Sequence, residues 1–349
     1  MSKVLMKGAE ALAQAAISGG CRYFFGYPIT PQNEVPEYMS AHLPEVGGVY
    51  VQGESEVASI NMVLGAASTG AQVMTSSSSP GISLMSEGLS YLAANELPCV
   101  VMNVTRGGPG LGGILPSQCD YNQATKGGGN GDYHLFVLAP GDLQEGVDLV
   151  QRAWDYAFKY MTPVMVLADG FMGQMMEPVE IKERTAVKGD WKKWATGCFR
   201  ERGNKRTLFH SLYLAGETLE EHNIHLQRKY AQMQSDAMAE EYLLDDAEIV
   251  ITAFGTAARI ARTAVDHLRA KGVKVGLLRP ITLYPFPEKN YQGLGPSVKN
   301  ILVVEMNCGQ MLYDVKLATR FRWPVTFYGR TGGMAPSVEE IEDQCRKLL

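Results

Sequence analysis

The chain has 349 residues, 46% of them hydrophobic and 20% charged, which is enough material for two domains with buried cores. Its formal net charge of −5 argues against a nucleic-acid-binding surface. Glycine, serine or charged residues interrupt every apolar stretch well before the ~18 residues that a membrane span needs. We therefore expect a globular protein that binds neither nucleic acid nor membrane.

The first half of the chain alternates helical patterns with short apolar runs. Residues 1–20 have the pattern of an amphipathic helix that ends in Gly-Gly, which differs from a signal peptide. Strands are predicted at 21–27, 48–53, 71–76, 98–106, 134–140 and 163–169, and helices at 7–18, 56–69, 82–94 and 142–160. This alternation predicts an α/β fold with a doubly wound parallel sheet. The loops at 26–31, 76–81 and 105–110 are then expected at one edge, beyond the carboxyl ends of the strands.

A long glycine-rich stretch covers residues 107–132. It lacks the G-x-G-x-x-G spacing between a strand and a helix, and the chain has no G-x-x-x-x-G-K-[ST] motif. A loop that covers a substrate or forms a subunit interface is the favoured interpretation, and phosphate binding is the alternative.

The second half begins with a charged segment and then returns to an α/β pattern. Residues 181–245 contain a long polar helical pattern, which we interpret as a connector packed on a partner or a neighbouring domain. Strand, glycine turn, helix, glycine turn and strand follow between 248 and 280, which predicts a βαβ unit. Further strands are expected at 299–307 and 324–329. The predicted domains are therefore 1–180 and 246–349, joined by the connector.

The six cysteines are scattered, and none forms a C-x-x-C pair. This spacing argues against a zinc site or an iron–sulfur cluster held by this chain alone, so no metal site is predicted. Free thiols are typical of a reducing cytoplasm, which is the expected location. Any redox centre that the protein uses is expected on another subunit.

Two features leave alternatives open when they are read from the residues alone. Glu54 and Glu56 precede a helical run of small residues, either as a solvated first turn that favours the helix dipole or as a carboxylate aimed into an apolar cofactor site. The serine-rich loop at 76–81 either binds an anion through its hydroxyls and the following helix N-terminus, or simply makes a strand-to-helix turn.

Several spaced motifs resemble one family. The segments at 26–35 (GYPITPQNEV), 54–92 and 103–110 (NVTRGGPG) are similar to the α-type subunits of 2-oxoacid:ferredoxin oxidoreductases, and residues 248–287 are similar to that family's second domain. The resemblance implies two doubly wound parallel-sheet domains. The first would bind the pyrimidine of thiamine diphosphate, and the second would be related to the transketolase C-terminal domain.

The resemblance also implies roles for particular residues. In this family a carboxylic acid at the start of a small-residue helix hydrogen-bonds the aminopyrimidine ring of the cofactor, and the match is to Glu56. Glu54 fits only with a two-residue shift, so we expect it to cap the helix near the cofactor. The remaining matches are Thr30 near the reacting centre, Arg106 on the substrate carboxylate, and Ser79 and Pro80 as cofactor contacts.

Missing motifs imply partner chains. The G-D-G…N pattern that holds Mg²⁺ and the diphosphate is absent, which implies a β-type subunit that supplies both. The resemblance further implies a γ-type subunit, a ferredoxin-like subunit with [4Fe–4S] clusters, coenzyme A as cosubstrate and ferredoxin as acceptor. The stretch at 123–140 is most like the branched-chain (2-oxoisovalerate) members. The alternatives are a pyruvate or 2-oxoglutarate enzyme, and a non-catalytic scaffold.

Overall fold

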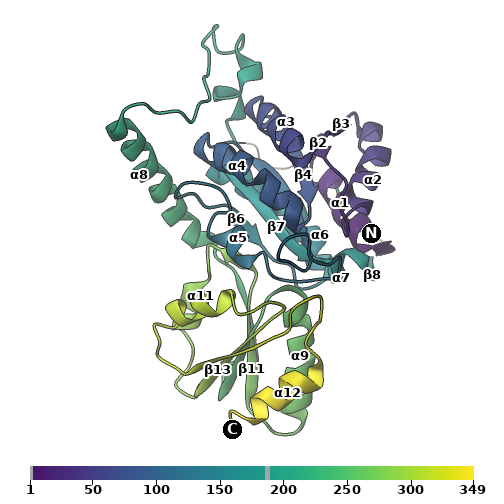
Figure 1. Ribbon diagram of the computed structural model, residues 1–349, viewed down its shortest axis with the longest axis vertical. Helices are drawn as coiled ribbons and strands as arrows, with labels where there is room; N and C mark the ends of the chain where they lie inside the picture. Colours follow the sequence, from purple (N-terminus) through teal and green to yellow (C-terminus); the bar gives the residue numbers. More distant parts are fainter. Residues whose placement is uncertain (1–2, 185–188) are drawn as a thin grey trace.

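The structure, a computed structural model, describes residues 3–184 and 189–349. Figure 1 shows two α/β units, with the N-terminal unit above the C-terminal one. The larger sheet has seven strands in the order β12-β6-β7-β5-β4-β2-β3, and the smaller has five in the order β14-β13-β10-β11-β9. The predicted fold class, α/β with two parallel-sheet units, is confirmed.

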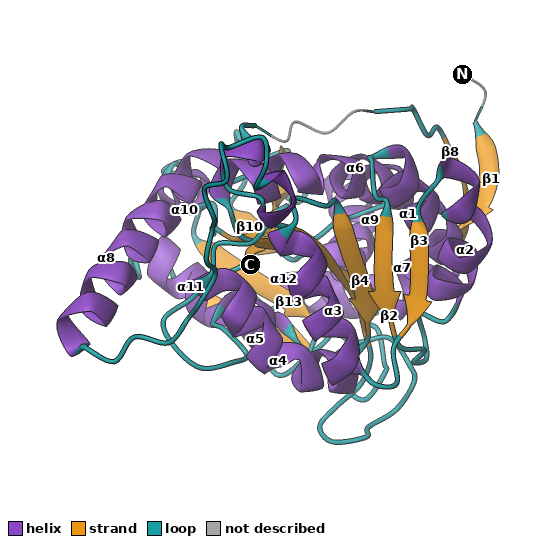
Figure 2. Ribbon diagram, turned by 90° about the horizontal axis from the view of Figure 1, so that it is seen from above, coloured by secondary structure: helices purple, strands orange, loops and turns teal. Residues whose placement is uncertain are grey.

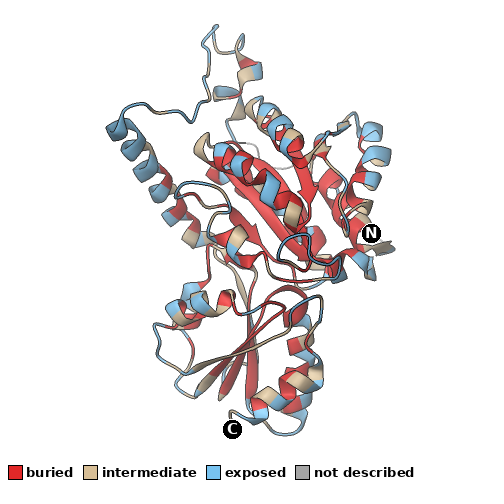
Figure 3. Cartoon of the chain, viewed as in Figure 1, coloured by how far each residue is buried: buried red, intermediate tan, exposed pale blue. Residues whose placement is uncertain are grey.

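The larger sheet is parallel except at its β12 edge. Its strands are β2 (Tyr23–Gly26), β3 (Val49–Gln52), β4 (Val73–Ser77), β5 (Cys99–Thr105), β6 (Phe136–Leu138), β7 (Pro163–Asp169) and β12 (Thr282–Tyr284). Every residue of β4, β5 and β7 is buried, because helices cover both faces of the sheet. These central strands begin with apolar residues, and the polar residues of β4 and β5 gather toward their carboxyl ends, which lie at one edge of the sheet (Figure 3).

Helices lie on both faces of this sheet (Figure 2). One layer contains α1 (Gly8–Ser18), α2 (Glu34–His42) and α6 (Leu143–Tyr160), and the other contains α3 (Glu56–Ser68), α4 (Ser79–Ala94) and the short α5 (Tyr121–Thr125). Helices α3 and α4 pack closely, because a Cβ on Gly88 would lie only 2.6 Å from Ile60 Cγ2. The packing fixes the start of α3 beside the start of α4.

The C-terminal unit contains a second buried sheet. Its elements are β9 (Ala239–Tyr242), β10 (Ile249–Thr252), α9 (Gly255–Ala270), β11 (Val275–Pro280), α10 (Glu288–Gln292), β13 (Asn300–Glu305), α11 (Met311–Ala318), β14 (Val325–Gly329) and α12 (Val338–Arg346). Alanines on one face of α9 pack on β10, β11 and β13 in a separate apolar cluster. The βαβ unit expected between 248 and 280 is present as β10-α9-β11.

Two local predictions were wrong, and strand β12 was not predicted. Residues Val4–Lys7 form strand β1 rather than helix, paired antiparallel with β8 (Met176–Val179), and α1 is buried on nearly all sides because its small alanines fit between α2 and α6. The polar helix α8 (Gly216–Met233) ends well before residue 245, and β9 follows because it pairs with β11. Strand β12 belongs to the larger sheet although it follows β11.

The connector region between the two units contains several short elements and the helix α8. It contains the 3-10 turns Trp191–Lys193, Thr196–Cys198 and Gln234–Asp236, and a further such turn, Pro44–Val46, follows α2. Helix α8 contacts the N-terminal unit through His222 Nε2, 2.9 Å from Ala94 O, and through Lys229 Nζ, 3.1 Å from Glu96 Oε1. Within the described residues, no helix has both the length and the apolar character of a membrane span.

Candidate functional site

Three loops that follow neighbouring strands of the larger sheet meet at its carboxyl edge. The Arg106 amide donates to Ser79 Oγ at 3.0 Å, and Ser79 Oγ is also 3.2 Å from Arg106 O. Arg106 Nη1 donates to Thr30 O at 2.9 Å. The structure therefore brings Thr30, Ser79 and Arg106 together, as their positions after β2, β4 and β5 led us to expect.

Glu56 is the first residue of α3, and its carboxyl group faces α4. Ser55 caps the helix by accepting from the Ala58 amide at 3.2 Å. Glu56 is 6% exposed, whereas Glu54 is exposed to solvent. A Cβ on Gly81 would lie 2.7 Å from Glu56 Oε1, so the absence of a side chain there leaves space for the carboxyl group.

The Glu56 carboxyl group is unpartnered within residues 3–184 and 189–349. The same point above Gly81 would lie 2.0 Å from Ser77 Oγ, so the hydroxyl and the carboxyl group flank one small space. The hydroxyls of Ser77 and Ser78 are both buried without a hydrogen-bond partner. Buried polar groups in native proteins are almost always paired, so this cluster is expected to pair with a polar ligand.

Arg106 is buried and keeps free bonding capacity. Its Nη1 and Nη2 atoms donate to Thr30 O and Leu111 O at 2.9 and 3.0 Å, and its Nε has no partner. The part of the chain that the structure describes offers this guanidinium no carboxylate. A buried, unpaired guanidinium that already holds two loops is suited to bind a planar anion.

Asp120 is a site residue that sequence reasoning missed. Its Oδ2 atom accepts from Ser79 Oγ at 2.7 Å and from Asn103 Nδ2 at 2.9 Å. It therefore fixes the start of α4 against the end of β5. The only signal in the sequence was one of two aspartates within the glycine-rich stretch, and its two partners lie far away in the chain.

The glycine-rich stretch divides into two parts. Residues 107–116 form an exposed loop, with Leu111 83% exposed. From Ser117 the chain packs on the C-terminal unit: Gln118 Nε2 donates to Phe254 O at 2.7 Å, and the Met306 amide donates to Gln118 Oε1 at 3.0 Å. The second part of the stretch is thus a contact between the two units.

Two further carboxyl groups are buried but well bonded. Asp169 accepts from the amides of Phe171 and Met172 and from Thr256 Oγ1. Glu305 accepts from two amides and from Asn307 Nδ2. Burial raises the pKa of both groups, and these hydrogen bonds offset part of the shift.

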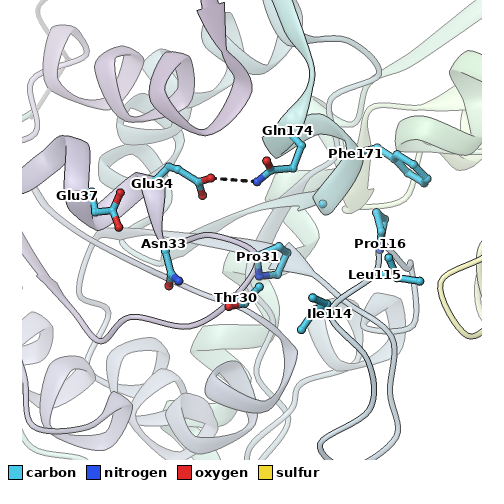
Figure 4. Close-up of a pocket in the computed structure, with 11 residues that line it drawn as sticks. Thr30, Pro31, Asn33, Glu34, Glu37, Ile114, Leu115, Pro116, Phe171 and Gln174 are labelled. Atoms are coloured by element: carbon cyan, nitrogen blue, oxygen red, sulfur yellow. Dashed lines mark hydrogen bonds between the residues drawn. The ribbon is translucent and has the colours of Figure 1, made fainter.

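A cavity of about 600 Å³ opens beside Thr30. Figure 4 shows Ile114, Leu115 and Phe171 on its right side, while Glu34 and Glu37 approach from α2. Phe171 and Gln174 come from the short helix α7 (Gly170–Gln174). Pro80 lines a second cavity, of about 370 Å³, together with Ser79 and residues of the C-terminal unit.

Comparison with known families covers nearly the whole chain. Residues 14–243 match the family described as pyruvate flavodoxin/ferredoxin oxidoreductase, thiamine diphosphate-binding, and residues 247–341 match pyruvate:ferredoxin oxidoreductase core domain II. The ketoisovalerate oxidoreductase subunit VorB of Methanothermobacter marburgensis is 46% identical over all of this chain and 97% of the relative. The 2-oxoglutarate synthase subunit KorA of Methanocaldococcus jannaschii is 36% identical, over 98% of this chain and 99% of the relative.

Solved structures show the same architecture. The 2-oxoglutarate:ferredoxin oxidoreductase of Magnetococcus marinus, solved with 2-oxoglutarate, coenzyme A and succinyl-CoA bound, aligns with a TM-score of 0.85 at 29% identity. The alignment covers 99% of this chain but only 65% of that one, so this chain spans about two thirds of its length. A split-gene transketolase aligns with a TM-score of 0.59 at 11% identity, a likeness of fold alone.

Proposed function

The chain belongs to the 2-oxoacid:ferredoxin oxidoreductases, as a subunit of a multi-subunit oxidoreductase, and from this premise we propose its role in the reaction. It supplies the pyrimidine-binding half of a thiamine diphosphate site that decarboxylates a branched-chain 2-oxoacid oxidatively to its acyl-CoA. Electrons leave to ferredoxin. One observation carries the proposal: Glu56 presents a buried carboxyl group without a partner within the described residues.

The residues around Glu56 fit an aminopyrimidine ring. Such a ring carries both hydrogen-bond acceptors and donors, and Glu56 with the unpaired Ser77 and Ser78 hydroxyls offers the complementary set. When bound, thiamine diphosphate supplies a carbon nucleophile and an electron sink. Glu56 would hold a proton at a ring nitrogen, in a site whose dryness strengthens that contact. Glu54, exposed two residues before Glu56, does not cap the helix as expected, because Ser55 does; it would only favour the positive end of the helix dipole.

The loops after β2 and β5 would contact the substrate. Arg106 would bind the carboxylate of the 2-oxoacid through its guanidinium, which the carbonyls of Thr30 and Leu111 hold in place. The Thr30 hydroxyl would contact the reacting group from the opposite loop. Ser79 and Pro80, at the start of α4, would border the cofactor.

The substrate assignment is supported by the relatives with the name ketoisovalerate oxidoreductase, which are 45–46% identical, against 34–37% for those named 2-oxoglutarate synthase. 2-Oxoglutarate or pyruvate is the second candidate, because the lower group shares the same domains. A scaffold without turnover would have no need of an unpaired carboxyl group in this pocket.

A β-type subunit would complete the site. The outward faces of α3 and α4 beside Glu56 carry exposed apolar side chains, namely Val57, Met62, Leu84 and Tyr91. Exposed apolar side chains on neighbouring helices are typical of a subunit interface. The partner there would hold Mg²⁺ and the diphosphate. A γ-type subunit that contacts coenzyme A and a ferredoxin-like subunit with [4Fe–4S] clusters would complete a cytoplasmic enzyme.

The test is anaerobic purification of the tagged chain with its partners, followed by viologen reduction with 2-oxoisovalerate, pyruvate and 2-oxoglutarate, each with and without coenzyme A. We expect coenzyme A-dependent reduction that is fastest with 2-oxoisovalerate. Faster reduction with 2-oxoglutarate or pyruvate would overturn the substrate assignment. A complete complex, with cofactor and clusters, that reduces viologen with none of the three would overturn the proposed function.

A further inference from the structure

The cavity beside Thr30 has two chemically different sides (Figure 4). Ile114, Leu115 and Phe171 make an apolar side, and Pro31 and Pro116 extend it. Glu34 and Glu37, three residues apart on α2, bring carboxylates to the other side. At about 600 Å³, the cavity is larger than any small alkyl group needs, so its chemistry matters more than its size.

The apolar side is fixed directly to Arg106. Arg106 forms a β-bridge with Pro116, and the Gly107 amide donates to Leu115 O at 3.0 Å. The guanidinium reaches back to Leu111 O in the same loop and to Thr30 O at the mouth of the cavity. Arg106 itself does not line the cavity, but Thr30, whose carbonyl it holds, lines it together with Ile114. A 2-oxoacid whose carboxylate lies on Arg106 would therefore extend past Thr30 into this cavity.

The charge on the other side is negative. Glu34 pairs with Lys7 Nζ at 2.5 Å and accepts from Gln174 Nε2 at 3.3 Å. Burial opposes ionisation of Glu34, but the hydrogen bonds from Lys7, the backbone and Gln174 together with the Lys7 charge outweigh it, so the pKa of this carboxyl group lies below its ordinary value. Glu37 is exposed and has no ionic partner among the described residues. No lysine or arginine is among the described residues that line the cavity.

We propose that this cavity is the side-chain pocket of the 2-oxoacid and selects aliphatic monocarboxylic substrates over dicarboxylic ones. The inference rests on the proposed function and specifies its substrate class. An alkyl chain gains apolar contact with Ile114 and Leu115. A second carboxylate would instead approach Glu34 and Glu37, and no lysine or arginine lines the cavity to offset the repulsion between like charges.

Selection by charge makes a prediction that selection by size does not. Because the cavity has spare volume, longer branched acids such as 4-methyl-2-oxopentanoate should also be accepted, whereas 2-oxoglutarate, of comparable length, should be rejected. Reversing the charge at Glu37 should then admit the dicarboxylic acid without enlarging the cavity.

The experiment uses the purified complex and compares kcat/KM for 2-oxoisovalerate and 2-oxoglutarate. Glu37→Lys should raise the ratio of 2-oxoglutarate to 2-oxoisovalerate about tenfold or more, and Glu37→Gln should give an intermediate value. Glu45→Lys is the matched control, since Glu45 carries the same charge after the end of the same helix and does not line the cavity. It should leave the ratio unchanged.

A second variant tests the apolar side. Ile114→Ala should lower kcat/KM for 2-oxoisovalerate about tenfold and affect pyruvate, which has only a methyl group, much less. Wild-type ratios in both Glu37→Lys and Ile114→Ala, in complexes active with 2-oxoisovalerate, would overturn this inference alone. A wild-type complex that turns over none of these acids would overturn the proposed function, and this inference with it.

Discussion

The two units each bury a glutamate at the carboxyl edge of their sheet, and the two glutamates differ in what surrounds them. Glu305, at the end of β13, is fully buried, and its two oxygens accept from the Met311 and Leu312 amides at 2.9 and 3.2 Å. Asn307 Nδ2 donates to it as well, at 2.9 Å. Glu56, at the start of α3, is 6% exposed and has no such donor within the described residues.

This difference separates a structural carboxyl group from a functional one. Burying a carboxyl group is costly, and hydrogen bonds from fixed donors offset that cost at Glu305. At Glu56 no hydrogen bond within the described residues offsets it, so the carboxyl group keeps its bonding capacity for a ligand. Burial alone therefore does not mark a site; burial together with missing partners does. Arg106 with its unpaired Nε follows the same logic.

Glu56→Gln is the change with the largest expected effect. It keeps the shape of the side chain but removes its ability to exchange a proton with the cofactor ring, so turnover of the 2-oxoacid should fall about 10²- to 10⁴-fold. Viologen reduction by the purified complex measures this. The matched control is Glu54→Gln, which should remain near wild-type activity. An equal loss in the control would show that the acid was assigned to the wrong residue.

Arg106→Ala should act mainly on substrate binding. Loss of a charged hydrogen-bonding group should raise KM for the 2-oxoacid about 10- to 100-fold, with a smaller change in kcat. Steady-state kinetics at saturating coenzyme A separates the two constants. An unchanged KM would remove Arg106 from the substrate site.

Glu305→Ala should show the opposite behaviour to Glu56→Gln. It leaves two amides and one side-chain amide without an acceptor in a buried place, which should cost about 2–4 kcal/mol in the free energy of unfolding. Urea unfolding of the complex measures the loss. At low temperature, where the variant is folded, its kcat should be close to that of the wild type. Wild-type stability would contradict a structural role.

Gln118 tests whether the C-terminal unit positions the site loop. Gln118→Ala removes the contacts to Phe254 O and the Met306 amide, and we expect a loss of about 1–3 kcal/mol together with a raised KM for the 2-oxoacid. Gln123→Ala is the control in the same segment, since the only hydrogen bond of the Gln123 side chain within the described residues is to Ser83 Oγ of its own unit. If both variants change KM and the free energy of unfolding equally, the contact between the units does not position the site loop.

Glu96 provides a carboxyl group of a third kind, partly exposed and paired with cations on α8. Burial opposes its ionisation, but Lys229 and His225 outweigh this, so its pKa lies below 4.5. Its contribution to stability is therefore fully present above the pKa of the unfolded state, and it is lost as the pH falls through the lower pKa of the folded state. Glu96→Gln should cost about 1 kcal/mol or less at pH 7. Urea unfolding measures the difference in the free energy of unfolding between wild type and variant. This difference should be smaller at pH 4 than at pH 7.

Much of this arrangement was predictable from the sequence, for an identifiable reason. Thr30, Ser79 and Arg106 each follow a buried strand, and parallel strands deliver the residues that follow them to one edge. Asp120 and Gln118 were not predictable in this way. Their roles depend on which distant segments they touch, such as Ser79 for Asp120 and Phe254 for Gln118.

The errors in the fold prediction have the same origin. Strands β1, β9 and β12 contain only three or four residues each, and their pairing partners lie more than 30 residues away. Local periodicity over so few residues does not distinguish a strand from a loop or a helix end. Long-range pairing decided these segments, whereas the central strands were already defined by their own apolar sequence.

The most direct measurement compares the unfolding of wild-type and Glu56→Gln complexes after thiamine diphosphate has been removed. If Glu56 is buried for the sake of a ligand, the variant should be as stable as the wild type or more stable, because an unpaired carboxyl group has been replaced by a neutral amide. Addition of the cofactor should then stabilise the wild type more than the variant. A variant that is clearly less stable than the wild type without cofactor would contradict this, and would place Glu56 with Glu305 among the structural carboxyl groups.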